Sequence, residues 1–136
     1  MASVFVDTNI FLYCFDHSDP TKRDIALSLV TGLRDSLVTS TQILQEFYWN
    51  ATRKLKMTPM EGKQAVDELG KRKVIQVSTL MISQAIDTSD LHRISFWDAL
   101  IVEAASTARC SKLLSEDLNH GQVIRGIKIE NPFVSN

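Results

Sequence analysis

The sequence is poor in the residues and patterns that mark several protein classes. Its two cysteines, Cys14 and Cys110, are too few for a disulfide framework or a zinc site and favour a reducing compartment. Five glycines and three prolines form no linker or low-complexity tract, so we expect a single domain spanning residues 1–136. The chain also lacks a signal-peptide pattern and any apolar run near the ~20 residues of a membrane span. We therefore expect a soluble, cytoplasmic protein with no membrane partner.

The charges nearly cancel, because 15 lysines and arginines stand against 16 aspartates and glutamates and leave a net charge of −1. This balance excludes the strongly basic surface of histone-like DNA-binding proteins, so any nucleic-acid contact must come from a local patch. Hydrophobic residues make up 44% of the chain and charged residues 23%. Both fractions are close to the globular average, which excludes disorder for most of the chain.

Short apolar runs alternate with longer segments of helical periodicity. The expected strands cover residues 4–6, 37–39, 74–77, 112–115 and 127–129. The expected helices begin at Asp19-Pro20, Thr41, Thr58-Pro59, Leu80 and Ser95. The helix after Thr58 has the clearest signals, with a capping box completed by Glu61 and a stop at Gly70. This alternation predicts an α/β fold with a mostly parallel sheet covered by helices on both faces.

Four acidic residues fall just past predicted strands or early in predicted helices: Asp7, Glu46, Asp98 and Asp117. In open parallel sheets, sites form outside the carboxyl ends of the strands, so this fold could bring the four together. Three of the acids also have a simple structural explanation, whereas Asp7 is harder to explain in this way. Asp98 could complete a capping box with Ser95, Glu46 could lie on a solvated helix flank, and Asp117 could form a turn. Their joint placement favours a functional site.

Clustered carboxylates have a direct chemical consequence. They repel one another and raise one another's pKa values, so the cluster is costly unless a cation neutralises it. Hard divalent ions prefer oxygen ligands, and with no histidine or cysteine in the set we expect Mg²⁺ or Mn²⁺ rather than zinc. A pair of such ions can stabilise the attacking and leaving oxygens of a phosphodiester.

The same segments resemble a known family. They are residues 4–9 (VFVDTN), 40–47 (STQILQEF), 95–101 (SFWDALI), 114–118 (LSEDL) and the tail 131–133 (NPF). In this order and spacing the chain resembles a PIN-domain ribonuclease, and more narrowly the VapC type of toxin from toxin–antitoxin pairs. The resemblance implies a three-layer α/β/α sandwich and Mg²⁺- or Mn²⁺-dependent cleavage of RNA by metal-activated water. It also implies an antitoxin protein that blocks the acidic cleft, and a homodimer.

Carried over residue by residue, the resemblance makes Asp7, Glu46, Asp98 and Asp117 the catalytic and metal-binding acids. Three further matches follow, with Thr8 and Asn9 as a polar pair that supports the first acid and Ser115 as the small hydroxyl residue before the last one. Glu116 and Asp117 are adjacent carboxylates that strand geometry points in opposite directions, so one of them should face the metal, and we favour Asp117.

Basic residues near the helix ends have two explanations. Arg53, Lys54 and Lys56, and likewise residues 71–73, could complement the negative ends of helices or form a surface that tracks phosphates. Two rival functions are a catalytically silent PIN-like module that binds RNA or protein and a phosphate-handling α/β phosphatase. The phosphatase would need a second aspartate two residues after Asp7, where this chain has Asn9.

Overall fold

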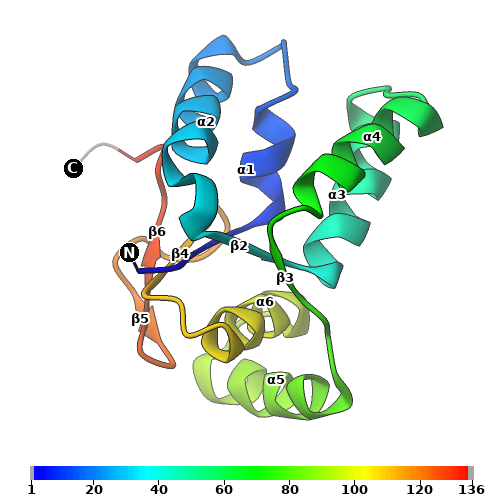
Figure 1. The fold of residues 1–136 in the computed structure, drawn as a ribbon. Helices are drawn as coiled ribbons and strands as arrows, with labels where there is room; N and C mark the ends of the chain where they lie inside the picture. The colour runs from blue at the N-terminus through cyan, green and yellow to red at the C-terminus, as the bar shows by residue number, and fades with distance from the viewer. Residues whose placement is uncertain (1, 135–136) are drawn as a thin grey trace.

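The computed structural model describes residues 2–134, and its centre is a mostly parallel sheet (Figure 1). The strands are β1 (Val4–Val6), β2 (Leu37–Ser40), β3 (Lys73–Ile75), β4 (Lys112–Leu114), β5 (Val123–Ile124) and β6 (Ile127–Glu130). Their spatial order is β3-β2-β1-β4-β6-β5, and every neighbouring pair is parallel except β5 with β6. The predicted α/β class with a mostly parallel sheet is confirmed.

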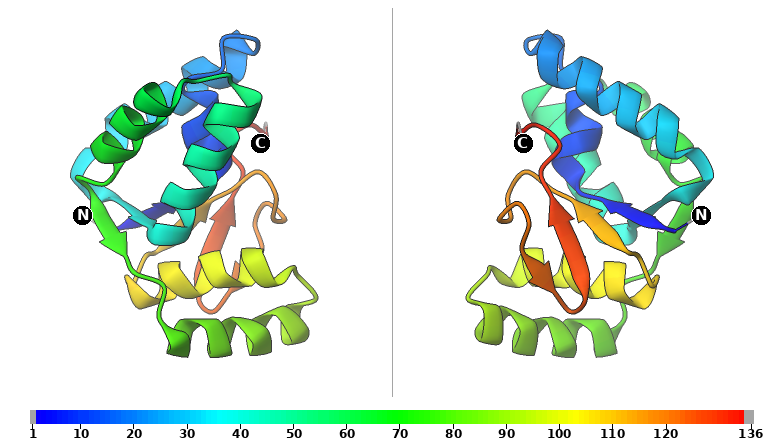
Figure 2. Two further views of the ribbon diagram at one scale, coloured as in Figure 1. Left: turned by 90° about the vertical axis from the view of Figure 1, so that its right-hand side faces the viewer. Right: turned by 90° about the vertical axis from the view of Figure 1, so that its left-hand side faces the viewer.

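Helices cover both faces of the sheet. They are α1 (Thr8–Tyr13), α2 (Pro20–Leu33), α3 (Thr41–Lys54), α4 (Pro59–Leu69), α5 (Thr79–His92) and α6 (Phe96–Thr107), and a short 3-10 turn, η1 (Arg34–Ser36), precedes β2. Figures 1 and 2 show α1–α4 on one face and the packed pair α5 and α6 on the other. This is the expected three-layer α/β/α sandwich.

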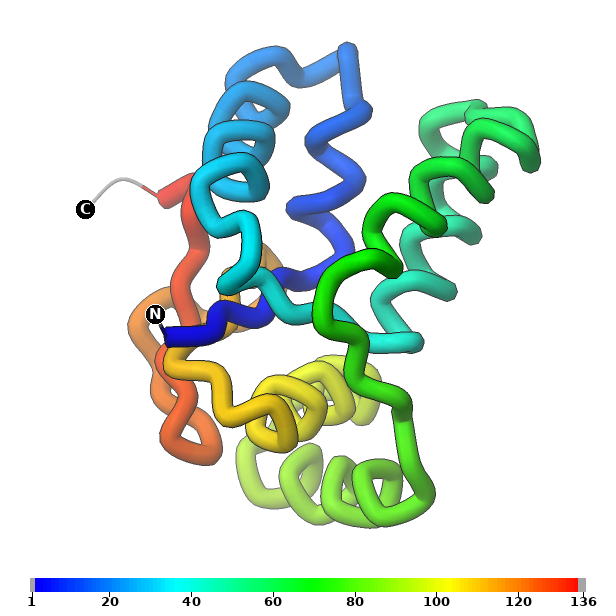
Figure 3. Tube along the Cα trace, viewed as in Figure 1, coloured from blue at the N-terminus to red at the C-terminus, as the bar shows by residue number. Residues whose placement is uncertain are grey.

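The strand order reverses direction at β1. The chain first adds β2 and β3 on one side of β1, then crosses the opposite face through α5 and α6 and places β4 on the other side (Figure 3). Residues about a hundred positions apart thereby become neighbours, because Val6 pairs with Leu114. In open sheets, the crevice at the carboxyl ends of such a switch point is where ligands bind.

Local signals explain most helix boundaries. Asp19 caps α2 and Pro20 occupies its first turn, while Thr58 and Glu61 form the full reciprocal capping box of α4, which ends at Gly70. β1 and β2 are buried along their whole lengths, as expected for strands covered on both faces. In the described part of the chain, no helix combines the length and apolar character that a membrane crossing requires.

Three elements differ from the sequence prediction. The strand expected at 74–77 is found at Lys73–Ile75, because its partner β2 ends at Ser40. Beyond that point the Val77 backbone N–H donates to the Thr41 hydroxyl (3.2 Å) instead of to a strand.

The helix α1 and the strand β5 were not predicted. In α1 the apolar residues Ile10, Phe11 and Leu12 are consecutive and all buried, so the segment shows no amphipathic period. The two-residue strand β5 depends on a tight turn to β6, in which Arg125 and Gly126 both have positive φ angles (54° and 76°). Such a turn is typical of β-hairpins, but the Arg-Gly pair is not a strong signal for it.

Candidate functional site

Asp7 lies at the switch point of the sheet. Its backbone N–H donates to the Leu114 carbonyl (3.0 Å), which continues the pairing of β1 with β4 by one residue. The side chain is 3% exposed and caps α1. One carboxylate oxygen accepts from the Thr8 backbone N–H (2.6 Å) and the other from the Ser115 hydroxyl (2.8 Å). Contacts from both neighbouring segments therefore hold the Asp7 carboxylate in one orientation.

Asp117 follows β4 and is oriented by Ser115, which also contacts Asp7, and by Asn9. The Ser115 hydroxyl accepts from the Asp117 backbone N–H (3.2 Å), so this one hydroxyl links the two acids. The Asn9 side-chain amide donates to both Asp117 carboxylate oxygens, at 3.2 and 3.1 Å. Thr8, Asn9 and Ser115 thus each contact at least one of the acids.

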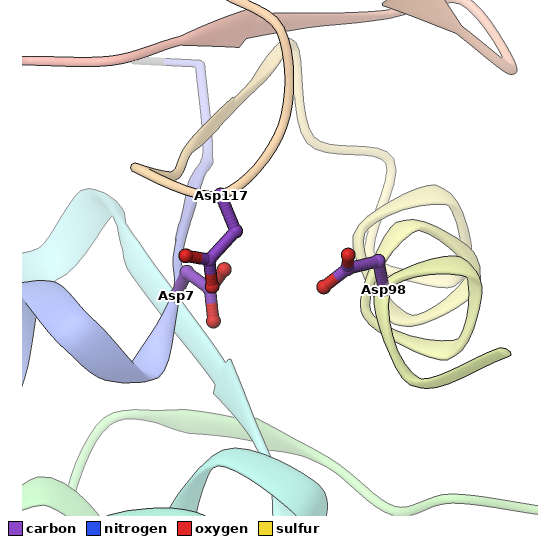
Figure 4. Close-up of side chains that lie close together, drawn as sticks. All are labelled: Asp7, Asp98 and Asp117. Atoms are coloured by element: carbon purple, nitrogen blue, oxygen red, sulfur yellow. The ribbon is translucent and has the colours of Figure 1, made fainter. Parts of the chain in front are cut away.

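Asp98 reaches the site from the opposite layer. It lies in the first turn of α6, where the Ser95 hydroxyl caps the helix by accepting from the Asp98 backbone N–H (3.0 Å). Figure 4 shows its carboxylate pointing towards Asp7 and Asp117. One oxygen from each of these three carboxylates lies within 4.8 Å of the others. The cap therefore explains how Asp98 is positioned, and its side chain remains available to the cluster.

Glu46 completes the acidic lining without joining the close group of three. It is half-buried on α3 and accepts a hydrogen bond from the Thr8 hydroxyl (2.9 Å). Together with the three aspartates it lines a polar cleft of about 100 Å³. All four predicted acids therefore face one cleft at the carboxyl edge of the sheet, which we call the acidic cleft.

The sequence analysis missed Asn50 and Ile101, which also line this cleft. Asn50 is one helical turn beyond Glu46 and donates to its backbone carbonyl (2.9 Å), so the i, i+4 spacing could have indicated it. Ile101 is one turn after Asp98 and resembles any other buried helical isoleucine. Within residues 2–134, none of His17, His92 and His120 lines the cleft.

Glu116, the other carboxylate of the adjacent pair, does not line the cleft. Its carboxylate forms an ion pair with Lys22 and accepts from the Tyr13 hydroxyl (2.7 Å). It therefore does not act as a supporting acid, and its direction agrees with the rule that adjacent side chains after a strand point to opposite sides. Asp117 is thus the member of the pair that faces the cleft.

Burial dominates the electrostatics of the cleft. Desolvation raises the pKa of Asp7 from 3.8 to about 7. The hydrogen bonds from Ser115 and Thr8 oppose this rise, and the charges of Asp117 and Glu46 add to it. The pKa of Asp117 is also raised, first by desolvation and then by its acidic neighbours, while the charge of Lys54 lowers it. Without a bound cation, the protein therefore holds its central carboxylate partly protonated near neutral pH.

The donor set fits a hard divalent cation. Asp7, Asp98 and Asp117 supply carboxylate oxygens alone, in a polar cleft with room for water ligands. A cation would also supply the positive charge that the buried Asp7 lacks, since no lysine or arginine among the described residues lines the cleft.

Comparisons with known proteins are consistent with this geometry. The family model of the PIN domain matches residues 4–125. A search of curated proteins gave no significant match. Among solved structures, Mycobacterium tuberculosis VapC20, described as a sarcin-ricin loop cleaving toxin, superposes with a TM-score of 0.71 and 19% identity over 85% of this chain and 90% of that one.

Two complexes show the same fold. A chain of a toxin–antitoxin complex from Klebsiella pneumoniae has a TM-score of 0.75 and 18% identity, covering 96% of this chain and 98% of its own. A chain of DNA-bound VapBC from Salmonella typhimurium has a TM-score of 0.70 and 17% identity, covering 97% and 99%. At such identities the likeness establishes the fold.

The raised pKa of Asp7 predicts a pH-dependent effect of Asp7→Asn on the metal-free protein. Between about pH 4 and pH 7 the folded state keeps a proton that the unfolded state releases, so the wild type loses stability as pH rises. Asparagine stays neutral and can still accept from Thr8. We expect the stability of the variant relative to the wild type to grow by about 2–3 kcal/mol between pH 5 and pH 8, in urea unfolding with a chelator.

The matched control is Asp90→Asn, an exposed aspartate of α5. Its difference from the wild type should not change with pH. An equal effect of Asp7→Asn at both pH values would contradict the assignment of a raised pKa to Asp7.

Proposed function

The chain belongs to the PIN domain family, and we propose that it is a metal-dependent endoribonuclease acting as the toxin of a toxin–antitoxin pair. We further propose that residues 1–136 form this enzyme as one domain. The observation that carries the proposal is the close group of Asp7, Asp98 and Asp117 at the switch point of the sheet. A buried carboxylate among other carboxylates is costly, and the binding of a cation is the function that offsets this cost.

We assign Mg²⁺ or Mn²⁺ to the oxygens of Asp7, Asp98 and Asp117, with Glu46 beside them. A bound ion would activate a water nucleophile and offset the charge that builds up on the scissile phosphate. The chain's own residues hold the acids ready for this role. Thr8 and Ser115 orient Asp7 by donating to its two carboxylate oxygens, and the Asn9 amide orients Asp117 by donating to its carboxylate. No side-chain nucleophile is needed.

Glu46 has a separate part in the proposed mechanism. Its Oε1 accepts from the Thr8 hydroxyl, which orients the carboxylate in the lining of the cleft and leaves Oε2 outside that hydrogen bond. An oxygen in that position suits the orientation of the attacking water and the acceptance of its proton. Glu46 therefore acts on the nucleophile rather than as a main ligand.

The named toxins among the similar structures support a toxin role, and the sarcin-ricin loop cleaving toxin supports RNA as the substrate. The two rival functions account less well for the residues of the acidic cleft. A silent binding module has no need of four acids around one cleft, and a phosphatase nucleophile would lack its partner because Asn9 stands two residues after Asp7.

Metal binding should stabilise the fold. At ten times the dissociation constant, an ion that binds only the native state adds about 1.4 kcal/mol, which thermal unfolding detects as a rise in Tm. The rise should occur with Mg²⁺ or Mn²⁺ and vanish in Asp7→Asn/Asp98→Asn. Equal shifts in the wild type and in this double variant would place the ions elsewhere.

The adjacent pair Glu116 and Asp117 offers a matched test of cleavage. Incubated with total RNA and Mn²⁺, the wild type should produce discrete cut ends that a chelator abolishes. Asp117→Asn and Asp7→Asn should slow cleavage by about 100-fold or more, because each removes charge stabilisation at the reacting phosphate. Glu116→Gln, which leaves the cleft intact, should retain most of the activity. Metal-independent cleavage, or full activity in Asp7→Asn, would contradict the proposed mechanism.

We also propose a protein partner that silences the cleft. An arginine from that partner could bind the paired carboxylates through its planar fork of donors and exclude the metal. The surface has a place for such a partner to dock. A groove of about 610 Å³ between α3 and α4 is lined mainly by apolar groups, with Tyr48, Trp49 and Val66 among them, and Trp49 is 59% exposed.

Homodimerisation remains a proposal as well. The helix α5 exposes Ile82 and Ile86 on one face, and a second copy of the chain would cover them. Light scattering in solution decides between one copy and two.

The toxin role predicts a growth phenotype. Expression of the chain alone should arrest growth, co-expression of the adjacent gene product should lift the arrest, and Asp7→Asn should cause none. The two proteins should also copurify. If the wild-type chain is soluble, well expressed and harmless, a processing nuclease or a silent module replaces the toxin hypothesis.

A further inference from the structure

A second cavity adjoins the acidic cleft. It has a volume of about 240 Å³ and lies between α1, the loop after it and the end of α3. Leu12 and Leu55 give it an apolar lining, and Asn9, Tyr13 and Lys54 form its sides. Asn9 lines both the acidic cleft and this cavity, which we call the flanking pocket. The flanking pocket therefore lies directly beside the acidic cleft, where the next part of an RNA strand bound in the cleft would lie.

Lys54 is the positively charged residue among those that line the flanking pocket. It is the exposed last residue of α3 and lies one helical turn after Asn50, which lines the acidic cleft. In the part of the chain that the structure describes, its ammonium group has no hydrogen bond or ion pair. Its neighbours are engaged elsewhere, since Arg53 lies over the Trp49 ring (4.6 Å) and Lys22 pairs with Glu116.

The other lining side chains indicate where in the flanking pocket a phosphate fits. Asp16 also lines the pocket, where its carboxylate accepts from the Ser18 backbone N–H and hydroxyl (3.0 and 2.6 Å), and its negative charge disfavours a phosphate beside it. Tyr13 is a fixed wall, because its hydroxyl donates to Glu116 and its ring packs edge-on against Phe133 (5.1 Å). A phosphate therefore fits at the Lys54 side, and an uncharged sugar or base fits beyond it.

We propose that the flanking pocket binds the nucleotide next to the scissile bond, with Lys54 holding its phosphate. This inference rests on the proposed ribonuclease function and assigns the substrate a second contact outside the acidic cleft. The acids and their metal would be occupied by the scissile phosphate, so the next phosphate needs a cation of its own. If Lys54 only complements the end of α3, its loss will affect stability and leave RNA binding unchanged.

The test measures RNA binding separately from cleavage. A fluorescein-labelled RNA oligonucleotide of mixed sequence is titrated with Asp98→Asn protein, which does not cut it, and with the same protein carrying Lys54→Gln. We expect binding to weaken about tenfold and the slope of log affinity against log salt to fall by about 0.7, as for one lost phosphate contact on a single strand. Lys54→Arg should restore both values.

Two controls make the test specific. Lys128→Gln removes an exposed lysine from β6, near the amino edge of the sheet, and should change neither value. In cleavage by otherwise wild-type protein, Lys54→Gln should raise KM for the oligonucleotide with little change in kcat. It should have no effect on a dinucleotide, whose one phosphate occupies the cleft.

The outcomes separate the two proposals. If the wild type binds RNA but does not cut it, the ribonuclease function is wrong. The effect of Lys54→Gln on RNA binding can still be measured in that case. Equal binding by Lys54→Gln and its parent, an unchanged salt slope, or an equal loss in Lys128→Gln overturns the flanking pocket. The absence of any RNA binding overturns it as well.

Discussion

The burial of one carboxylate, that of Asp7, is the constraint around which the rest of the site is arranged. The side chain sits where the strand order reverses, so β1 and β4 both end against it, and water is largely excluded. Its two oxygens already accept from Thr8 and Ser115, yet its pKa is still raised to about 7. Hydrogen bonds alone do not offset the desolvation. A bound cation would offset it, and the same ion would provide the chemistry that the PIN fold is proposed to perform here.

The supporting polar residues act by sharing contacts. The Ser115 hydroxyl donates to Asp7 and accepts from the Asp117 backbone N–H. Thr8 contacts two acids, because its backbone N–H donates to Asp7 and its hydroxyl donates to Glu46. The orientations of Asp7, Glu46 and Asp117 therefore each depend on a residue that also contacts another acid, whereas Asp98 is positioned separately by the Ser95 cap. Such coupling preserves the spacing of mutually repelling carboxylates, which would otherwise move apart in the absence of metal.

The charged residues around the acidic cleft have different positions relative to it. Glu116 pairs with Lys22 on the far side of its backbone, which removes one negative charge from the cleft, and Lys54 adds a positive charge at its edge. An acidic cleft repels the phosphates of a nucleic acid, and local cations at its margin reduce that repulsion without occupying the metal position. The near-zero net charge of the whole chain is compatible with this arrangement because the relevant charges are local.

The amino-acid sequence by itself determined the fold class, most element boundaries and the identity of the four acids. These features depend on local signals: buried strands have continuous apolar runs, Thr58 and Glu61 form a capping box, and acids follow the strands. The sequence did not determine α1 or the β5–β6 hairpin, because three consecutive buried residues have no helical period and β5 has only two residues.

Only the tertiary structure decided which side chains share the cleft. Asp7 and Asp117 meet because β1 pairs with β4, and Asp98 joins them because α6 crosses the opposite face. The direction of Glu116, the lining role of Asn50 and the position of Lys54 in the flanking pocket follow from the same packing. Spacing along the chain specifies an element and its exposed face, but the distance between side chains on different elements depends on how those elements pack.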